Sequence, residues 1–351
     1  MLKAHKSWRL ALTVIILSIT LLITMATSKH GNSTELKILC AGSLKIPLSK
    51  LSEIFSNKYG VKVYIEPSGS VEVIRKVVDL GKPCDVIAIA DYRLIPLYLV
   101  PNYTDWYIAF ATNEIVLAYT ESSKYSEELN KNPSLWIDIL SRDAVKYGFS
   151  DPNKDPCGYR ALGVIALASL FYNDSTILER LLTSRVNGIS VNITGGSKDD
   201  NVHIYVSPSL KTTKNVVIRP KSVDLISLLE SGALDYAFEY KSVAIQHNLR
   251  FVELPPAINL GNPNYDNFYN RVIIHILAGT EKEKEIIMKS IVYGITIPKN
   301  ALNRDLAVKF VKLLLSNKGR RIFENSGQPF LDIPIGYGSV PKELRKYVKE
   351  G

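Results

Sequence analysis

The chain has 351 residues, 46% of them hydrophobic and 22% charged, with 43 Lys and Arg against 34 Asp and Glu. These values exclude a disordered chain, a disulfide-stapled miniprotein and a polytopic membrane protein, and they indicate a globular protein of two or three domains. The cysteines, Cys40, Cys84 and Cys157, form no C-x-x-C pair. We therefore expect core thiols rather than a disulfide framework or a cysteine-rich zinc site.

Residues 1–28 are typical of an export signal or an uncleaved membrane anchor. Lys3, Lys6 and Arg9 precede an uncharged apolar stretch that runs from residue 10 to residue 28, and a polar stretch follows. This stretch is long for a cleaved signal and just long enough to cross a bilayer once, so the sequence leaves both alternatives open. We expect the protein at the extracellular face of the cell membrane, anchored by this segment or released from it.

Lys3, Lys6, Arg9 and Lys29 supply four of the nine net positive charges, so the remaining chain is only mildly basic. A mild positive charge favours a small anionic ligand through long-range steering. Lys and Arg do not cluster between aromatic residues, and we therefore expect no nucleic acid as a partner.

From residue 36 onward, short apolar strands alternate with amphipathic helices, which predicts α/β units on a largely parallel sheet. A polar stretch at about 173–213 predicts a hairpin that decorates the surface of the fold. The predicted strands cover 36–43, 61–70, 84–91, 113–119, 147–152, 233–240 and 293–301, and the predicted helices cover 48–59, 71–81, 156–174, 222–232 and 306–314.

These units suggest two lobes, because the chain shows no repeat and no Gly/Ser-rich linker. We expect lobe I to comprise 36–118 and 241–340, lobe II to comprise 119–240, and 341–351 to form a tail. Without a flexible joint, the chain must cross between the lobes through the strands themselves.

Four turns share one design, in which a strand ends in a small polar cluster and a helix follows at once. They lie at 41–43, 67–70, 155–158 and 220–222. The first backbone N–H groups of a helix lack partners within the helix and carry partial positive charge, so such a turn can bind an anion. The hydroxyls of Ser43 and Ser70 add donors. The same residues are also ordinary helix caps, and the pattern alone does not say whether the four turns meet.

Several segments resemble the archaeal tungstate/molybdate-binding proteins of ABC importers, a branch of the type II periplasmic binding fold. The resemblance runs from about residue 36 to about residue 337, and the combination of SDPNxDPCGYR with YKSVAxQH is specific. The segments are LCAGSL, PSGSVEVIRKV, DVIAIADY, NEIVLAY, FSDPNKDPCGYRA, SGALDYAFEYKSVAIQH, FVELP and YGITIPKNA. The resemblance implies two α/β lobes, each a mixed, mostly parallel sheet flanked by helices, with the ligand in the cleft between them.

The resemblance also implies a set of ligand-binding residues. Ser43 and Ser70 would donate to oxo groups, Cys157 would offer its backbone N–H, and Tyr240 would donate its hydroxyl. Asp155 would bond to the metal itself, because W(VI) and Mo(VI) are Lewis-acidic and can expand from four oxygen ligands to six. Sulfur in sulfate cannot expand in this way, so the same carboxylate would repel sulfate and phosphate.

The sequence departs from the family pattern at one position. The pattern places a second metal-bound carboxylate, a glutamate, eighteen residues before the tyrosine, and this chain has Ser222 there. We expect Glu239 to be the substitute ligand, although strand alternation would point it away from Tyr240 unless the strand has ended. Ser222 can still contribute its hydroxyl or its backbone N–H.

Other candidates carry less weight. Asp151 is expected to cap its turn, and Tyr159 and Arg160 are expected to fix the loop around Asp155. An alternative for Arg160 is that it adds positive charge near the anion. The five histidines are scattered, which argues against a histidine metal site. Three acidic residues at strand edges are expected to be structural: Asp85, Asp91 and Glu114.

Together these features predict a non-catalytic receptor that captures tungstate or molybdate and delivers it to the permease and ATPase of an ABC transporter. We expect a monomer with no cofactor besides this ligand. One alternative is a receptor for another tetrahedral oxyanion, such as sulfate or phosphate. An exported hydrolase is a further alternative, although the chain lacks a G-x-S-x-G motif, a P-loop and an evident catalytic triad.

Overall fold

The computed structural model describes residues 35–195 and 201–351, whose strands form three sheets. The expected export segment at 1–28 lies outside these residues, as do His5 and His30. Among the residues described, no helix combines the length and the apolar character that crossing a membrane requires. Residues 36–351 belong to one unit, which contains all the elements discussed below.

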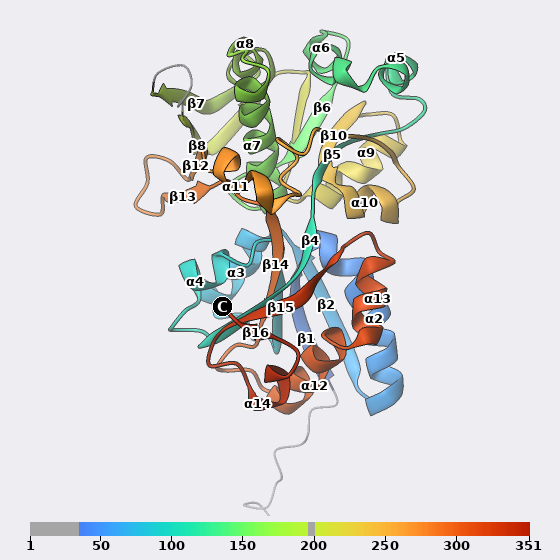
Figure 1. Ribbon diagram of the computed structural model, residues 1–351, viewed down its shortest axis with the longest axis vertical. Coiled ribbons are helices and arrows are strands. Elements are labelled where there is room, and N and C mark those ends of the chain that lie inside the picture. Colours follow the sequence, from blue (N-terminus) through green and yellow to red (C-terminus); the bar gives the residue numbers. More distant parts are fainter. Residues whose placement is uncertain (1–34, 196–200) are drawn as a thin grey trace, which may run out of the picture. The chain divides into compact units, whose positions relative to one another are not determined.

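The first sheet has seven strands and is mixed (Figure 1). Strands β1 and β3 pair in parallel, as expected for strands joined through helices. Strand β14 enters between β3 and β4 and pairs antiparallel with both. In spatial order the strands are β16 (Lys349–Glu350), β15 (Phe330–Gly338), β4 (Trp106–Asn113), β14 (Ile291–Thr296), β3 (Val86–Ile89), β1 (Glu35–Ala41) and β2 (Lys62–Ser68).

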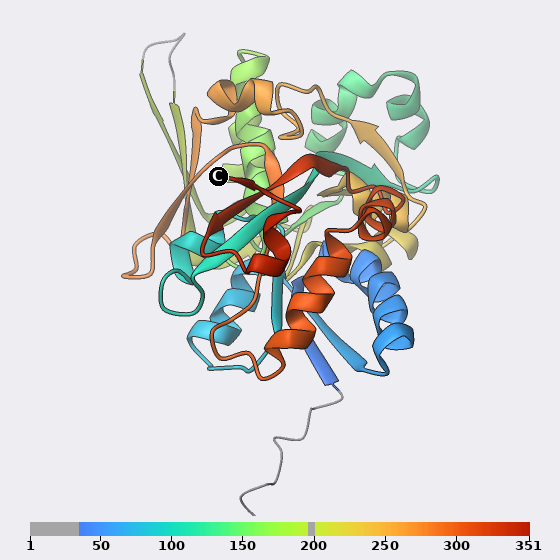
Figure 2. The same cartoon turned by 60° about the horizontal axis from the view of Figure 1, so that its bottom comes forward.

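Helices joined to this sheet bury one apolar face each. In α2, Leu48, Leu51 and Phe55 are fully buried, and Phe55 packs edge-on against Phe310 of α12. Figure 2 shows α2 in blue beside the orange α12. The helical segments here are η1 (Gly42–Leu44), α2 (Lys45–Tyr59), α3 (Ser70–Val78), α4 (Leu94–Tyr98), α12 (Arg304–Leu314), α13 (Asn317–Glu324) and α14 (Lys342–Arg345).

The second and third sheets belong together, because α7 contacts strands of both. The second sheet has a parallel centre of β10, β6 and β9, with the antiparallel β5 and β11 at its edge. Its spatial order is β11 (Arg250–Glu253), β5 (Ile115–Tyr119), β10 (Tyr236–Tyr240), β6 (Tyr147–Ser150) and β9 (Val216–Arg219). The third is β13 (Lys284–Ile287), β12 (Val272–Ile276), β8 (Asn201–Thr212) and β7 (Val186–Thr194).

Helix α7 (Pro156–Phe171) is apolar around most of its circumference, because it is covered from more than one side. The other helical segments of this part are short. They are α5 (Ser126–Lys131), η2 (Pro133–Leu135), α6 (Trp136–Ser141), α8 (Thr176–Leu178), η3 (Glu179–Thr183), η4 (Ser222–Leu225), α9 (Ile226–Glu230), α10 (Lys241–Gln246), η5 (Pro263–Tyr265) and α11 (Asp266–Tyr269).

The lobes have other boundaries than the sequence suggested. We call the part built on the first sheet lobe I (36–113 and 291–351) and the part built on the other two sheets lobe II (115–290). The chain leaves lobe I at Glu114, between β4 and β5, rather than at residue 118. It returns only at β14, because β11, β12 and β13 pair with strands of lobe II, where we expected lobe I from residue 241.

The strand pairs observed in the structure correct two further expectations. The hairpin expected at 173–213 contains β7 and β8, but β8 also pairs with β12, so it is part of a sheet and not a surface decoration. The expected tail at 341–351 contains α14 and the short β16, which pairs with β15. Backbone pairing across distant parts of the chain decides both cases, and neither leaves a local signal.

The crossings between the lobes run through strands, as expected from the missing linker. Only Glu114 separates β4 from β5, and residues 288–290 separate β13 from β14. Asn113, at the end of β4, donates through Nδ2 to Tyr293 Oη of β14 and to Ser242 Oγ of α10, both at 2.7 Å. Asn113 therefore joins the two crossings to the start of α10.

Candidate functional site

The four polar turns meet in two pairs, each with one turn from each lobe. A Cβ at Gly42 would lie 3.0 Å from Val223 Cγ2, so the turn of Ser43 lies against the turn of Ser222. A Cβ at Gly69 would lie 2.3 Å from the carbonyl oxygen of Lys154. Only glycine allows this close approach between the start of α3 and the loop before α7. The structure thus brings together turns that the sequence identified only one by one.

The start of α3 already uses two of its free N–H groups on the opposite lobe. Val71 N and Glu72 N donate to the Lys154 carbonyl oxygen at 3.1 and 3.2 Å. These donors lack partners within their own helix, so a carbonyl from lobe II satisfies them. The lobes are therefore in direct contact at this point.

Three buried hydroxyls each accept a hydrogen bond from the protein. Ser43 Oγ accepts from Tyr293 Oη at 3.2 Å, and Ser70 Oγ accepts from Ala90 N at 2.9 Å. Tyr240 Oη accepts from Arg160 Nη1 at 2.7 Å. A hydroxyl has one hydrogen to donate, and the bonds that these three hydroxyls accept do not use it. Their side chains are at most 2% exposed.

Asp155 caps α7 and links it to the turn of Ser222. Its Oδ1 accepts from Cys157 N at 3.4 Å, and its Oδ2 accepts from Ser222 N at 2.8 Å. Burial is the main influence on this carboxyl, and it raises the pKa of Asp155 to about 6, against the effect of the two N–H donors and Arg160. The N–H of Cys157, expected to serve the ligand, therefore contacts Asp155 in this structure.

Glu239 is fully buried at the end of β10, close to Asp155. Its Oε2 accepts from Tyr240 N at 2.8 Å and from Cys157 Sγ at 3.9 Å. In the described part of the chain, its Oε1 is buried without a hydrogen-bond partner. Burial, assisted by the nearby Asp155, raises the pKa of Glu239 to about 8. A buried oxygen without a partner is costly unless a proton, a metal or a guest completes it.

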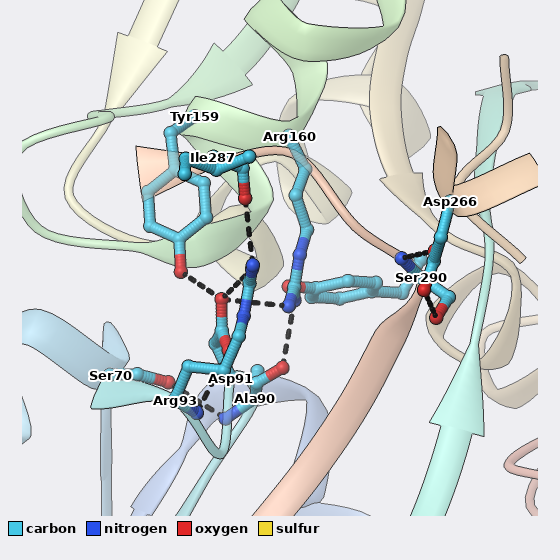
Figure 3. A network of polar contacts seen from close by, with 10 residues as sticks. Ser70, Ala90, Asp91, Arg93, Tyr159, Arg160, Asp266, Ile287 and Ser290 are labelled. Atoms are coloured by element: carbon cyan, nitrogen blue, oxygen red, sulfur yellow. Dashed lines mark hydrogen bonds and ion pairs between the residues drawn. The ribbon is translucent and has the colours of Figure 1, made fainter. Parts of the chain in front are cut away.

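Sequence reasoning missed the role of Arg160 and Tyr159. We expected both to fix the loop around Asp155, but they reach across to lobe I (Figure 3). Tyr159 Oη donates to Asp91 Oδ2 at 2.9 Å, and Arg160 Nη2 lies 3.2 Å from the same oxygen. The sequence places Asp91 more than sixty residues away, so no local pattern could have joined these side chains.

Tyr293 was also missed, although its strand was predicted. Its ring centroid lies 6.1 Å from that of Tyr240, and its hydroxyl bridges Asn113 and Ser43. Tyr293 therefore connects the hydroxyl of Ser43 to Asn113 at the strand crossing. A buried tyrosine in a β-strand is ordinarily a core residue, and its sequence context carried no other signal.

Asp85, expected to be structural, and Asp151, expected to cap its turn, have partners that fit these roles. Asp85 accepts from the backbone of Lys37 and Asn303, and Asp151 accepts from Asn153 N within its own turn. All three cysteines are buried and unpaired, as expected. Within the described ranges, no group of three or more His, Cys, Asp and Glu could hold a metal ion. A metal would need oxygens from elsewhere, which an oxyanion carries with it.

Two solved structures share the fold. The periplasmic molybdate-binding protein of Azotobacter vinelandii is 17% identical, with a TM-score of 0.52, covering 84% of this chain and 98% of that one. The sulfate-binding protein SubI of Mycobacterium tuberculosis is 12% identical, with a TM-score of 0.55, covering 85% of this chain and 87% of that one. At these identities the likeness shows the fold alone, and it confirms the expected two-lobed α/β class.

Closer relatives cover nearly the whole chain. A solute-binding protein of Staphylothermus marinus is 56% identical over 344 residues, 96% of each chain. A molybdate/tungstate-binding protein, WtpA, of Pyrococcus abyssi is 47% identical over 356 residues, covering 97% of this chain and 99% of the relative. Residues 36–328 match the family described as bacterial extracellular solute-binding protein. The chain therefore belongs to the family of bacterial extracellular solute-binding proteins.

Proposed function

We propose that the chain is a receptor for tungstate or molybdate that hands the oxyanion to the permease of an ABC transporter. The WtpA proteins of Pyrococcus abyssi and Thermococcus kodakarensis, 47% and 45% identical, are named for binding these two anions. The site supports the same cargo, because hydroxyl donors and two carboxyl groups gather where the lobes meet. The function is capture and release rather than catalysis, and no cofactor takes part.

One observation carries the proposal: hydroxyl donors and carboxyl oxygens lie in the same buried cluster. Ser43, Ser70 and Tyr240 have hydrogens to give to oxo groups. Asp155 and Glu239 are carboxyl groups, and in their ionised form they would repel an anion held only by hydrogen bonds. The combination suits a guest that is anionic at its surface and Lewis-acidic at its centre.

Tungstate and molybdate have this character. The three hydroxyls donate to oxo groups of the anion, and the central W(VI) or Mo(VI), which carries four oxo groups, accepts one oxygen each from Asp155 and Glu239, which completes six ligands. Oε1 of Glu239, which has no hydrogen-bond partner within the described ranges, is the atom that this arrangement employs. Ser222 contributes its backbone N–H by holding the Asp155 carboxylate in place. Sulfate offers no centre for the carboxylates, so they exclude it.

The transport cycle follows from the two strand crossings. The anion docks on one lobe, and the strands on either side of Glu114 and residues 288–290 flex as the other lobe closes over it. The closed form is then the state that the permease and its ATPase recognise. We further propose that the receptor acts as a monomer, and that residues 1–28 export it and either tether it to the membrane or are removed.

Titration calorimetry with tungstate, molybdate, sulfate and phosphate tests the proposal. We expect strong binding of tungstate and molybdate and weak binding of the other two. Equal binding of all four would reduce the protein to a receptor for tetrahedral oxyanions in general. A crystal structure with anomalous scattering from the metal would count the ligands and show whether Glu239 is among them; a four-coordinate guest would contradict the carboxylate roles.

A further inference from the structure

Asp91 and Arg160 form an ion pair that joins the two lobes (Figure 3). Asp91 follows β3 in lobe I, and Arg160 lies in the first turns of α7 in lobe II. Their closest charged atoms, Arg160 Nη2 and Asp91 Oδ2, are 3.2 Å apart, and both side chains are 1% exposed. Such a pair is screened little by solvent, and breaking it leaves a buried charge without its partner.

The same guanidinium also contacts the ligand-binding cluster. Arg160 Nη1 donates to the carbonyl oxygen of Ala90 in lobe I and to Tyr240 Oη in lobe II, both at 2.7 Å. Ala90 is in turn the residue whose N–H donates to Ser70 Oγ. A single planar group therefore bridges the end of β3 and the hydroxyl of Tyr240.

Lobe I presents Asp91 in a fixed position. Arg93, from the same lobe, donates to Asp91 through Nε at 3.0 Å and through Nη2 at 2.7 Å. Burial opposes ionisation, but Arg93 and Arg160 outweigh it, so the pKa of Asp91 falls to about 2. Arg93 also donates to the Ile287 carbonyl oxygen of lobe II at 2.7 Å, which is a further contact across the lobes.

We propose that Arg160 is a positioning residue that makes the alignment of Tyr240 depend on contact between the lobes. This inference rests on the proposed function, in which Tyr240 donates its hydroxyl hydrogen to the bound oxyanion. Arg160 occupies a lone pair of Tyr240 Oη, so the hydroxyl hydrogen points away from Arg160. Because the guanidinium fork is rigid, Asp91 and Ala90 determine where its Nη1 lies.

Separation of the lobes removes both lobe I partners of Arg160 at once. The guanidinium then loses its carboxylate and is free to leave Tyr240, so the hydroxyl loses its fixed direction. Ligand binding and lobe contact thus stabilise each other through one side chain, which is a coupling free energy in the thermodynamic sense. The coupling acts chiefly on release of the anion, because the contacts form only once the lobes meet.

A double-mutant cycle tests this coupling. The proteins are the wild type, Asp91→Asn, Tyr240→Phe and the combined variant, and stopped-flow tryptophan fluorescence measures tungstate association and dissociation. We expect Asp91→Asn to accelerate dissociation about 10- to 100-fold in the wild-type background, with little change in association. In the Tyr240→Phe background the same change should have an effect of less than about 3-fold. Equal effects in both backgrounds would overturn the proposal, because Asp91 would then only hold the lobes together.

Two further variants keep the test decisive. Arg160→Lys retains the charge but not the fork, so it should reproduce the faster dissociation of Asp91→Asn. Tyr159→Phe removes one hydrogen bond to Asp91 and leaves Arg160 unchanged. If Asp91→Asn fails to fold, Tyr159→Phe takes its place in the double-mutant cycle. Glu128→Gln is the matched control, since Glu128 forms a two-bond pair with Arg142 inside lobe II and should leave both rates unchanged.

Measurements with sulfate distinguish a failure of the proposed cargo from a failure of the proposed positioning role of Arg160. If the wild type binds sulfate and not tungstate, the proposed cargo is wrong, and the same cycle measured with sulfate still decides whether Asp91 acts through Tyr240. If tungstate binds but the cycle is additive, the cargo stands and the positioning role falls. Binding of neither anion would contradict both.

Discussion

The Asp155 carboxylate accepts the backbone N–H of Ser222 through Oδ2 at 2.8 Å, which joins the start of α7 to the start of η4. Ser222 stands where the resemblance led us to expect a glutamate. Its backbone supports one carboxylate, while the second, Glu239, comes from the neighbouring strand β10. Two buried carboxyl groups thus lie near each other, but Glu239 stands on β10 and not at the position of Ser222, and its role as the second metal ligand stays a prediction.

Removing the charge of Asp155 should weaken the binding of tungstate but not the binding of sulfate. Asp155→Asn keeps an oxygen for the helix cap but removes the negative charge that the proposed bond to the metal requires. Loss of an outer partner of a metal ligand already costs 10- to 100-fold in affinity, so we expect tungstate affinity to fall by at least about 100-fold. Sulfate affinity should stay the same or rise, because a repulsive charge is gone. Calorimetry with both anions checks this, and parallel losses for the two would contradict a metal-directed role.

Ser43→Ala and Ser70→Ala should each weaken both tungstate and sulfate by about 1–3 kcal/mol, since each removes one donor to a charged acceptor. Ser52→Ala is the matched control, because Ser52 is a buried serine of α2 whose Oγ has no partner among the residues described. The affinity of Ser52→Ala for both anions should match that of the wild type. A loss confined to tungstate would mean that the serines do not act as simple hydrogen-bond donors.

The ligand-free protein should become less stable as the pH rises from about 6 to about 8. Burial raises the pKa of Glu239 from its ordinary value of 4.5 to about 8, so the folded state binds more protons than the unfolded state between these values. Stability is therefore present at low pH and is lost as the pH rises through the folded pKa. The raised pKa of Asp155 also makes the folded state less stable as the pH rises, but only up to about pH 6.

Thermal unfolding at about pH 6, 7 and 8 measures this slope in the wild type and in Glu239→Gln. Glutamine has the shape of the protonated carboxyl and does not titrate, so the variant should lose much of the decline in melting temperature. If both proteins show the same slope, the pKa of Glu239 is not raised in the folded state.

Tungstate binding near pH 7 should release protons. With a pKa of about 8, Glu239 holds a proton in most ligand-free molecules at this pH, and a bond from Oε1 to the metal displaces it. We expect up to about one proton per anion bound, which falls as the pH rises above about 8. Calorimetry in two buffers of different ionisation enthalpy measures the number. Release that persists unchanged in Glu239→Gln would assign the proton to another group.

The order of strands and helices was readable from the sequence because it depends on neighbours in the chain. The buried strand β3 and the amphipathic helices α2, α3 and α12 lie close to their predicted positions. Strands without a clear pattern were missed, β11, β12 and β15 among them, because their partners lie far away in the sequence. The predicted lobe boundaries were wrong for the same reason, because strand pairing over long distances in the sequence decides where each lobe ends.

The resemblance implied the roles of Asp155 and Tyr240 and led to the choice of Glu239, whereas the sequence by itself determined which small polar turns stand before helices. Those are local features, because a helix start offers its N–H groups whatever lies opposite. Only the tertiary structure decided that the turns meet in pairs across the lobes, that the Glu239 carboxyl lies beside Cys157, and that Arg160 reaches Asp91. Contacts between side chains so distant in the chain arise when the sheets pack, and no periodicity within one segment records them.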